Sequence, residues 1–289
     1  MGEFRLPSGR PEVEAFYHED TGSLSYLVKD PDSPACAVID PVMDYEPHGA
    51  RSGFAFAERI AARIRERGLR LEWIIETHVH ADHLSAAWYL RTGLGGRIGI
   101  GARVARVREL FSDIYGVPED FLDAPFDHVF ADDERYRIGN LEAVAWHTPG
   151  HTPACMTHLI GDAAFVGDTL FMPDAGTARA DFPGGDAGML YDSIQRILAL
   201  PDETRVFVCH DYRPGGREVR WESRVVEQRA NVHLAGVDRD GFIARRRAID
   251  AGLDLPRLIL PSIQVNLRAG RFPLDETGRP WLKLPVDRL

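Results

Sequence analysis

The segment Thr77-His78-Val79-His80-Ala81-Asp82-His83 places three imidazoles and one carboxylate within six residues. It follows the apolar run 71–75 (LEWII), which is typical of a buried β-strand. If His78 and His80 leave that strand in extended geometry, their side chains project to the same side of the chain. A turn into a following helix then brings Asp82 and His83 round to a neighbouring position. Because histidine and carboxylate suit zinc, iron or manganese, the segment predicts a metal site.

Three more segments present a possible metal ligand just after an apolar run. The sequence TPGHTP at 148–153 puts His151 on a tight turn after a strand. FVGDTL at 165–170 and VFVCHD at 206–211 put Asp168 and His210 at the ends of two further strands. Each signal alone is moderate, because Asp and His are common turn residues. Together they repeat one arrangement, a ligand on a loop at a strand end, where scaffolds commonly place chemistry.

Strand-like and helix-like segments interleave along the chain. Short apolar runs bounded by Gly, Asp or Pro predict strands at 23–28, 35–40, 71–75, 97–101, 141–148 and 205–211, and a pair of strands, MTHLI and AAFVGD, within 156–168. Helical spacing of apolar residues predicts helices at 54–68, 84–92, 102–115, 188–200, 218–232 and 239–252. Because several neighbouring strands are joined by short turns, this pattern favours a mixed α/β layered fold over a purely parallel doubly wound sheet. Pro and Gly recur from about residue 253, which predicts one domain over 1–289 with an extended C-terminal segment, 253–289, wrapping it.

The composition is that of an ordinary globular protein, with 44% hydrophobic and 27% charged residues. A formal net charge of -10 without a long Lys/Arg block argues against nucleic acid as a partner. No window approaches the roughly 18 apolar residues of a membrane helix, and the first residues do not resemble a signal peptide. Cys36, Cys155 and Cys209 form no CxxC pair, so we expect reduced, buried thiols in a cytoplasmic protein. Cys155 lies close behind His151, and a redox-sensitive thiol is the alternative there.

The order HxHxDH, GHT, GD and a late His resembles the metallo-β-lactamase superfamily. The resemblance implies an αββα sandwich, with two mixed β-sheets flanked by helices and the metal site along one edge. In a two-metal site of this family, His78, His80 and His151 would hold one metal. Asp82, His83 and His210 would hold the other, and Asp168 would bridge the two.

Between Asp168 and Tyr212 the chain is similar to one branch, the persulfide dioxygenases (sulfur dioxygenases). The similarity rests on AGTARADFPGG at 175–185 and His210-Asp211-Tyr212, and the segment THVHADHLSAA resembles their bacterial group. It covers about Tyr17 to Asn231. It implies one Fe(II) per chain, held by His78, His151 and Asp168, and the oxidation of glutathione persulfide by O2 and water to sulfite and glutathione. His80, Asp82, His83 and His210 would then form a hydrogen-bonded shell around the ligands, and a homodimer is the expectation for this family.

Substrate residues are less well defined by the sequence. Arg179 is the candidate for gripping a glutathione carboxylate, because a guanidinium binds a carboxylate in bidentate fashion. Tyr212 is a candidate to present its phenol to the substrate, and Asp181 to orient Arg179 or a histidine. A solvated loop arginine, a packing tyrosine and a surface turn aspartate are the structural alternatives.

Two other functions fit the same ligand set. A dinuclear zinc thioesterase or hydrolase of the glyoxalase II type would use two zinc ions and need no oxygen. A persulfide- or metal-sensing module on this fold would bind without turnover. All seven residues needed for a dinuclear site are present, so the ligand types alone do not choose between one metal and two.

Overall fold

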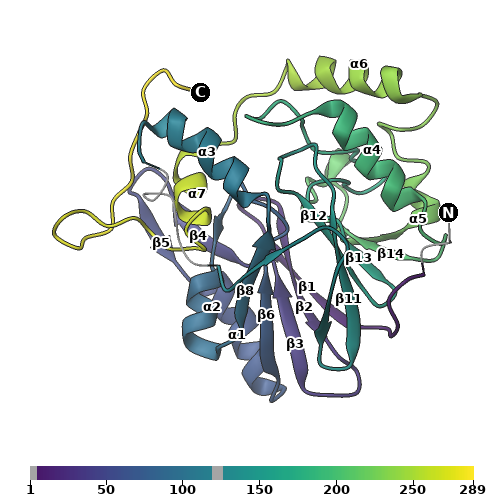
Figure 1. Cartoon of the computed structure of the whole chain (residues 1–289), viewed down its shortest axis with the longest axis horizontal. Coiled ribbons are helices and arrows are strands. Elements are labelled where there is room, and N and C mark those ends of the chain that lie inside the picture. The colour runs from purple at the N-terminus through teal and green to yellow at the C-terminus, as the bar shows by residue number, and fades with distance from the viewer. Residues whose placement is uncertain (1–4, 119–125) are drawn as a thin grey trace.

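Two six-stranded sheets pack face to face in the computed structural model, which describes residues 5–118 and 126–289 (Figure 1). Helices cover the outer face of each sheet. The predicted αββα arrangement of two mixed sheets is therefore confirmed.

The first sheet has the strand order β1-β2-β3-β6-β8-β9. Its strands are β1 (Glu12–His18), β2 (Ser23–Lys29), β3 (Ala35–Ile39), β6 (Arg70–Ile75), β8 (Arg97–Gly101) and β9 (His128–Phe130). The pairs β1–β2 and β2–β3 are antiparallel, whereas the pairs from β3 to β9 are parallel. Beside it, a small sheet contains β5 (Arg51–Gly53), β4 (Val42–Glu46) and β7 (Leu84–Ser85).

The second sheet has the strand order β10-β11-β12-β13-β14-β15. Its strands are β10 (Glu134–Ile138), β11 (Leu141–His147), β12 (Met156–Ile160), β13 (Ala163–Phe165), β14 (Arg205–Phe207) and β15 (Glu222–Arg224). Only the β13–β14 pair is parallel, because the chain runs through a long connection that includes α4 (Ala187–Leu198) before it returns as β14. The first sheet is mixed for the same reason, since a long connection also joins the parallel strands β3 and β6.

Seven α-helices occur in the described residues. They are α1 (Ala55–Glu66), α2 (Ala87–Leu94), α3 (Val104–Tyr115), α4 (Ala187–Leu198), α5 (Val225–Gln228), α6 (Arg239–Asp250) and α7 (Ile259–Asn266). Amphipathic α1 buries Ile60 and Ile64 against the outer face of the first sheet, and α4 buries Leu190 and Ile194 on the side of the second. None of the helices in 5–118 and 126–289 has the length and apolar character needed to cross a bilayer.

The main core lies between the two sheets. Tyr26 on β2 reaches across to the second sheet, where its ring meets Phe165 and Phe207 with centroids 5.4 and 5.5 Å away. Its hydroxyl donates to the carbonyl of Val208, so a buried polar atom is satisfied inside an apolar layer. This packing fixes the ends of β13 and β14 relative to the first sheet, and both strands lead into the metal-binding loops.

Strands outside the predicted set also occur, among them β1, β4 and β10, and two predicted segments in the later part of the chain take another form. The helix predicted for 218–232 is wrong over most of its length, because residues 222–224 form β15 and only Val225–Gln228 is helical. Buried Asp211 accepts hydrogen bonds from the Arg217 side chain and the backbone amide of Arg220, at 2.6 and 2.7 Å, and so holds the preceding residues in a loop.

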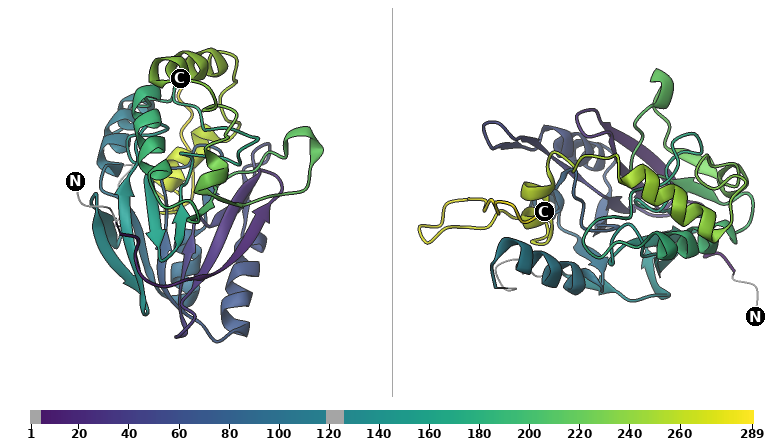
Figure 2. Two further views of the ribbon diagram at one scale, coloured as in Figure 1. Left: turned by 90° about the vertical axis from the view of Figure 1, so that its right-hand side faces the viewer. Right: turned by 90° about the horizontal axis from the view of Figure 1, so that it is seen from above.

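The second difference lies in the C-terminal segment. Residues 259–266, predicted to be extended, form α7, which packs beside α3, while the last residues run out as a loop (Figures 1 and 2). The helix buries Ile259, Ile263 and Val265. The segment therefore contributes to the core as well as covering it.

Candidate metal centre

Each predicted ligand follows a strand end at one edge of the sandwich. His78 comes three residues after β6, Asp168 three after β13 and His210 three after β14. His151 comes four residues after β11. The structure brings all seven predicted residues together in two adjoining groups, which are a triad (His78, His151 and Asp168) and a second group (His80, Asp82, His83 and His210). In each group, one ligand atom per residue lies within 4.8 Å of the others.

The triad presents three ligand atoms to one point. His78 Nε2 lies 3.8 Å and His151 Nε2 3.5 Å from Oδ2 of Asp168. All three residues are buried, and His78 Nε2 has no hydrogen-bond partner among the described residues. A buried nitrogen without a partner is costly unless something binds it, so the arrangement fits a metal ion.

Hydrogen bonds behind the triad fix the histidine rings. His78 Nδ1 lies 3.0 Å from the hydroxyl oxygen of Thr77, which in turn donates to Asp40 at 2.9 Å. His151 Nδ1 donates to the carbonyl of Arg179 at 2.8 Å. Because Nδ1 is engaged in both rings, Nε2 is the nitrogen that faces the metal position.

The second group surrounds the other side of Asp168. His210 Nε2 lies 3.3 Å from both Asp82 Oδ2 and Asp168 Oδ1. His80 instead directs Nε2 away from the group, toward Asp40 at 3.0 Å and Glu76 at 3.3 Å. His80 Nδ1 and His83 Nε2 are buried without a hydrogen-bond partner in the described part of the chain. This group therefore has the donor atoms for a second metal or for ordered water.

Burial favours the neutral form of two imidazoles next to the metal position, those of His78 and His83. Burial, followed by the neighbouring His80, lowers the pKa of His78 well below its ordinary value. Burial also lowers the pKa of His83 to about 4. Burial opposes charge on Asp82 as well, but His210 and His83 outweigh it and lower the pKa of that carboxyl. At neutral pH His78 and His83 are therefore neutral and Asp82 is a carboxylate, the forms that bind metal. Burial opposes charge on His80 too, but the two carboxylates that it contacts outweigh burial and raise its pKa.

Two glycines allow the ligand loops to approach their neighbours. Gly167 has φ +51°, and a Cβ there would lie 2.7 Å from the hydroxyl oxygen of Thr77. Gly150 has φ +145°, and a Cβ there would lie 2.3 Å from the backbone of Leu190 at the start of α4. A side chain at either position would push away the loop that carries Asp168 or His151.

Three supporting residues were not predicted from the sequence. Asp40 anchors Thr77 and His80, and Glu76 contacts His80. Asn266 on α7 donates to the carbonyls of His80 and His83, both at 2.8 Å. Asp40 and Glu76 each end an apolar strand run, which is the same signal that identified Asp168 and His210. No local pattern marks Asn266.

A hydrogen-bond chain joins the second group to the protein surface. His83 Nδ1 lies 3.2 Å from the Ser23 hydroxyl, which lies 2.7 Å from that of Thr21. The Thr21 hydroxyl lies 2.8 Å from His18 Nδ1, and His18 Nε2 lies 3.5 Å from the partly exposed carboxylate of Asp44. Hydrogen bonds from His83 to His18, followed by an ion pair with Asp44, thus connect the buried site to the surface.

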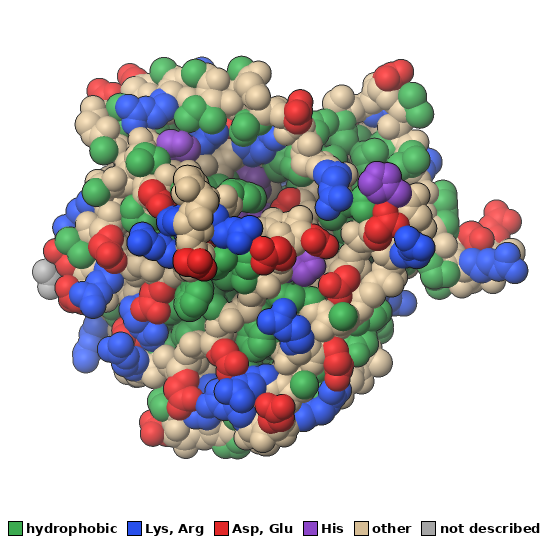
Figure 3. All heavy atoms as spheres, turned by 180° about the vertical axis from the view of Figure 1, so that it is seen from behind, with side chains coloured by type: hydrophobic (Ala, Val, Ile, Leu, Met, Phe, Trp, Pro, Cys, Tyr) green, Lys and Arg blue, Asp and Glu red, His purple; other side chains and the backbone are tan. Residues whose placement is uncertain are grey.

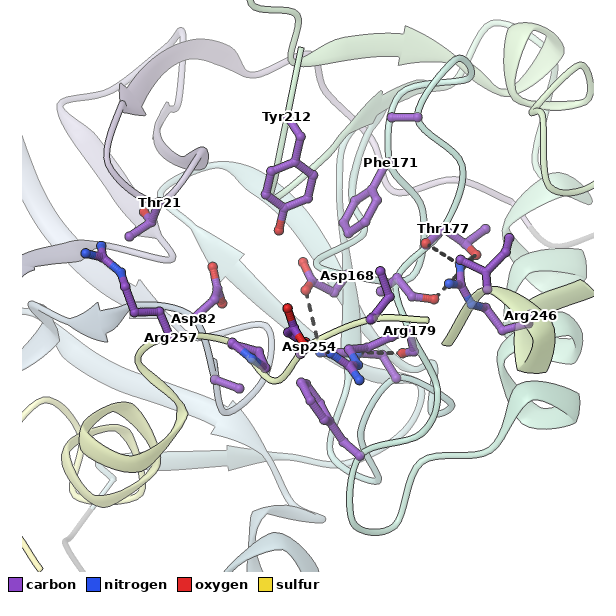
Figure 4. A pocket seen from close by; sticks show the side chains of 18 of the residues that line it. Thr21, Asp82, Asp168, Phe171, Thr177, Arg179, Tyr212, Arg246, Asp254 and Arg257 are labelled. Carbon is purple, nitrogen blue, oxygen red and sulfur yellow. Dashed lines mark hydrogen bonds and ion pairs between the residues drawn. The ribbon is translucent and has the colours of Figure 1, made fainter. Parts of the chain in front are cut away.

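A cavity of about 550 Å³ opens above the metal position (Figure 4). His151, Asp168 and Asp82 line its base. Arg179 and Tyr212, both predicted from the sequence, also line it. In the space-filling view the hollow is bordered by side chains of both charges (Figure 3).

The predicted substrate residues take up specific positions around this cavity. Nε and Nη2 of Arg179 donate to the carboxylate of Asp181, at 2.6 and 2.8 Å, and Nη1 donates to the carbonyl of Asp254. Tyr212 stacks on His210 with ring planes 3° apart, and its hydroxyl points into the cavity toward Asp168 (Figure 4). Asp181 is therefore a direct partner of Arg179, and the tyrosine hydroxyl is placed to meet a ligand.

Comparisons with known proteins agree with this site. The sequence model of the metallo-beta-lactamase superfamily matches residues 18–210. A probable metallo-hydrolase of Burkholderia pseudomallei is 49% identical over 96% of this chain and 99% of its own length. Glyoxylase B2 of Dictyostelium discoideum is 42% identical, with 98% and 99% covered. The mitochondrial persulfide dioxygenase of Bos taurus is 30% identical, with 91% of each chain covered.

Coverage differs among the relatives, and one solved structure shares the fold closely. The chain spans only 65% of a beta-lactamase hydrolase-like protein of Xylella fastidiosa, to which it is 48% identical over 96% of its own residues. The crystal structure of ETHE1 from Myxococcus xanthus has a TM-score of 0.73 and 27% identity, covering 90% of this chain and all of that one. The family match and the buried histidine–aspartate site together show that this chain is a member of the metallo-beta-lactamase superfamily.

Proposed function

We propose that the chain is a persulfide dioxygenase that uses one Fe(II) held by His78, His151 and Asp168. The observation that carries the proposal is the triad, of which His151 and Asp168 line the base of the cavity. Two histidines and one carboxylate with open positions are the ligand set of many non-haem Fe(II) oxygenases. The similarity to the persulfide dioxygenase of Bos taurus over 91% of both chains supports the same reaction.

The proposed reaction converts glutathione persulfide, dioxygen and water to glutathione, sulfite and two protons. The sulfur–sulfur bond breaks, the terminal sulfur is oxidised to sulfite, and dioxygen is reduced in the same step sequence. Both atoms of dioxygen and the oxygen of water are needed for the three oxygens of sulfite. Bound by the triad, Fe(II) would supply adjacent coordination positions at which sulfur and dioxygen meet.

The protein's own residues orient the reactants around that position. The Arg179 carbonyl holds His151 in place, and Thr77 does the same for His78. His210 Nε2, 3.3 Å from the carboxylates of Asp82 and Asp168, is suited to hold a water molecule by hydrogen bonds. The Tyr212 hydroxyl points at the same space and would donate a hydrogen bond to the substrate sulfur.

A second candidate function rests on the second group. Its four ligand atoms also lie within 4.8 Å of one another, so a dinuclear zinc hydrolase of the glyoxalase II type has a physical basis. The 42% identity to glyoxylase B2 favours this candidate. In our proposal, His80 Nε2 serves the carboxylates of Asp40 and Glu76, and the second group binds water rather than metal.

The two functions are separated by loading the metal-free protein with Fe(II) alone or with Zn(II) alone. Each preparation is assayed for oxygen uptake with glutathione persulfide and for hydrolysis of a glutathione thioester. We expect oxygen uptake with sulfite release in the iron protein and negligible thioester hydrolysis in both. Thioester hydrolysis by the zinc protein, without oxygen uptake by the iron protein, would contradict the proposal.

A further inference from the structure

Three arginines line the cavity above the metal position, and they differ in how their charge is used. They are Arg179, Arg246 and Arg257. Arg179 is bound by Asp181 and by the carbonyl of Asp254. Whether a guanidinium can bind substrate depends on whether its donors are already engaged.

Arg246 on α6 is also fully engaged. It is buried, and it pairs with Asp250 through Nε at 2.9 Å and Nη2 at 2.8 Å. Its remaining guanidinium nitrogen donates to the carbonyl of Thr177 at 3.0 Å. These contacts connect α6 to the loop that carries Arg179, so Arg246 stabilises the cavity wall and has no guanidinium nitrogen left for a ligand.

Arg257 makes no hydrogen bond or ion pair with any residue in 5–118 or 126–289. The same holds for Asp20, an exposed carboxylate in the turn after β1. Both residues line the cavity and also an adjoining hollow of about 640 Å³, so they mark the junction of the two. Figure 4 shows Arg257 beside Thr21 and Asp82, across the cavity from Arg246. Two opposite charges thus border one opening without neutralising each other.

We propose that Arg257 and Asp20 form a binding site for a zwitterion, the α-amino acid end of glutathione. Arg257 would bind the α-carboxylate and Asp20 the α-ammonium group, while the sulfur end lies at His151 and Asp168. A ligand that carries both charges on one carbon satisfies both side chains at once, whereas a simple anion satisfies only Arg257. The inference rests on the proposed function in taking glutathione as the carrier of the reacting sulfur.

The charges of the neighbouring loop support this assignment. In the adjoining hollow, Arg51 is paired with Glu46 at 3.3 Å, and Asp44 accepts from the backbone amide of Phe56 at 3.0 Å. Arg257 and Asp20 are therefore the charged groups at the junction that remain available to a ligand, among the residues described. The C-terminal segment would thus determine substrate specificity.

The test is a binding measurement that needs no turnover. Glutathione is titrated into the zinc-loaded protein by calorimetry, for the wild type and the variants Arg257→Gln and Asp20→Asn. We expect each substitution to weaken glutathione binding about tenfold, because each removes one charge-assisted hydrogen-bonding partner. Arg247→Gln on α6 is the matched control, since it makes the same charge change at an exposed position that does not line the cavity.

A second ligand assigns the groups. Glutathione that lacks the α-amino group should bind the wild type more weakly and should bind Asp20→Asn no more weakly than it binds the wild type. Unchanged glutathione affinity in Arg257→Gln, or equal losses in Arg257→Gln and Arg247→Gln, would overturn the inference. If Arg257→Gln weakens glutathione binding while the iron protein takes up no oxygen, the zwitterion site stands and the dioxygenase proposal fails. If the iron protein takes up oxygen and Arg257→Gln leaves the KM for glutathione persulfide unchanged, the dioxygenase proposal stands and the zwitterion site fails.

Discussion

The side-chain amide of Asn266 lies 2.8 Å from the backbone carbonyl oxygen of His80, although 186 residues separate them in the chain. The same amide nitrogen donates to the carbonyl of His83, and the amide oxygen accepts from the backbone N–H of Ser85 at 2.7 Å. One buried side chain on α7 thus satisfies three backbone groups of the loop that carries the HxHxDH motif. The C-terminal segment is therefore part of the metal centre's support.

Replacing Asn266 with Ala should destabilise the protein and weaken metal binding together. Three buried backbone groups would lose their partner, at a cost of about 2–4 kcal/mol in the free energy of unfolding. Loss of loop order should also lower metal affinity roughly tenfold. Denaturant unfolding of the metal-free protein and competition with a chelator measure the two effects separately.

Gln264 provides the matched control on the same helix. Its buried amide binds the backbone of Leu260 and Lys283 and does not touch the metal loop. Gln264→Ala should lower stability while leaving metal affinity near that of the wild type. Equal metal affinity in Asn266→Ala and the wild type would contradict the role assigned to Asn266.

Thr77→Val should lower metal affinity without a gross change in fold. The substitution keeps the shape but removes the hydroxyl that links His78 Nδ1 to Asp40, so the His78 ring loses its orientation. We expect about a tenfold loss in affinity. Thr157→Val, which removes a buried hydroxyl that lies 3.0 Å from that of Thr148, should lose stability alone. Identical metal affinities in the two variants would show that the Thr77 link does not support the site.

Substitutions in the two ligand groups should have different effects on metal content. In the mononuclear site we propose, His151→Gln removes a ligand and should reduce bound metal to well below one per chain. His210→Gln should keep about one metal per chain, because His210 lies in the second group. Mass spectrometry of metals on the purified variants measures this. A fall from two metals to one in His210→Gln would instead indicate a dinuclear centre.

The cysteines should be unreactive in the folded protein. Burial raises the pKa of Cys36 and of Cys155 to about 12, so both stay protonated through neutral pH, and the thiolate is the reactive form. Cys209 is buried as well. We expect negligible alkylation by iodoacetamide at pH 8 within an hour and complete alkylation in denaturant. Rapid labelling of Cys155 in the folded state would favour the redox-sensitive alternative.

The sequence predicted which residues come together at the candidate metal centre, because their signal is local. Apolar strands are followed by histidine or aspartate, and a strand end at the sandwich edge is where those residues come together. For this reason, each of His78, Asp168 and His210 comes three residues after the end of a strand, namely β6, β13 and β14. The alternation of strands and helices predicted a mixed α/β layered fold, and the resemblance to the metallo-β-lactamase superfamily implied the sandwich.

Long-range contacts explain what the sequence did not predict. Asn266 meets the metal loop through tertiary packing, and nothing near it in the chain marks that contact. The prediction of a helix at 218–232 was wrong because two long-range contacts set the backbone conformation there. Asp211 accepts a hydrogen bond from the amide of Arg220, and β15 pairs with β14. Arg179, the obvious guanidinium in the sequence, is held by Asp181, whereas the available arginine, Arg257, lies in a segment that local patterns describe poorly.

Oxygen consumption by the iron-loaded protein on addition of glutathione persulfide tests the central claim most directly. With bound iron quantified, we predict about one Fe(II) per chain and one molecule of sulfite formed for each dioxygen consumed, with uptake abolished in His151→Gln. Two tightly bound zinc ions per chain, with no oxygen uptake after iron loading, would contradict the account.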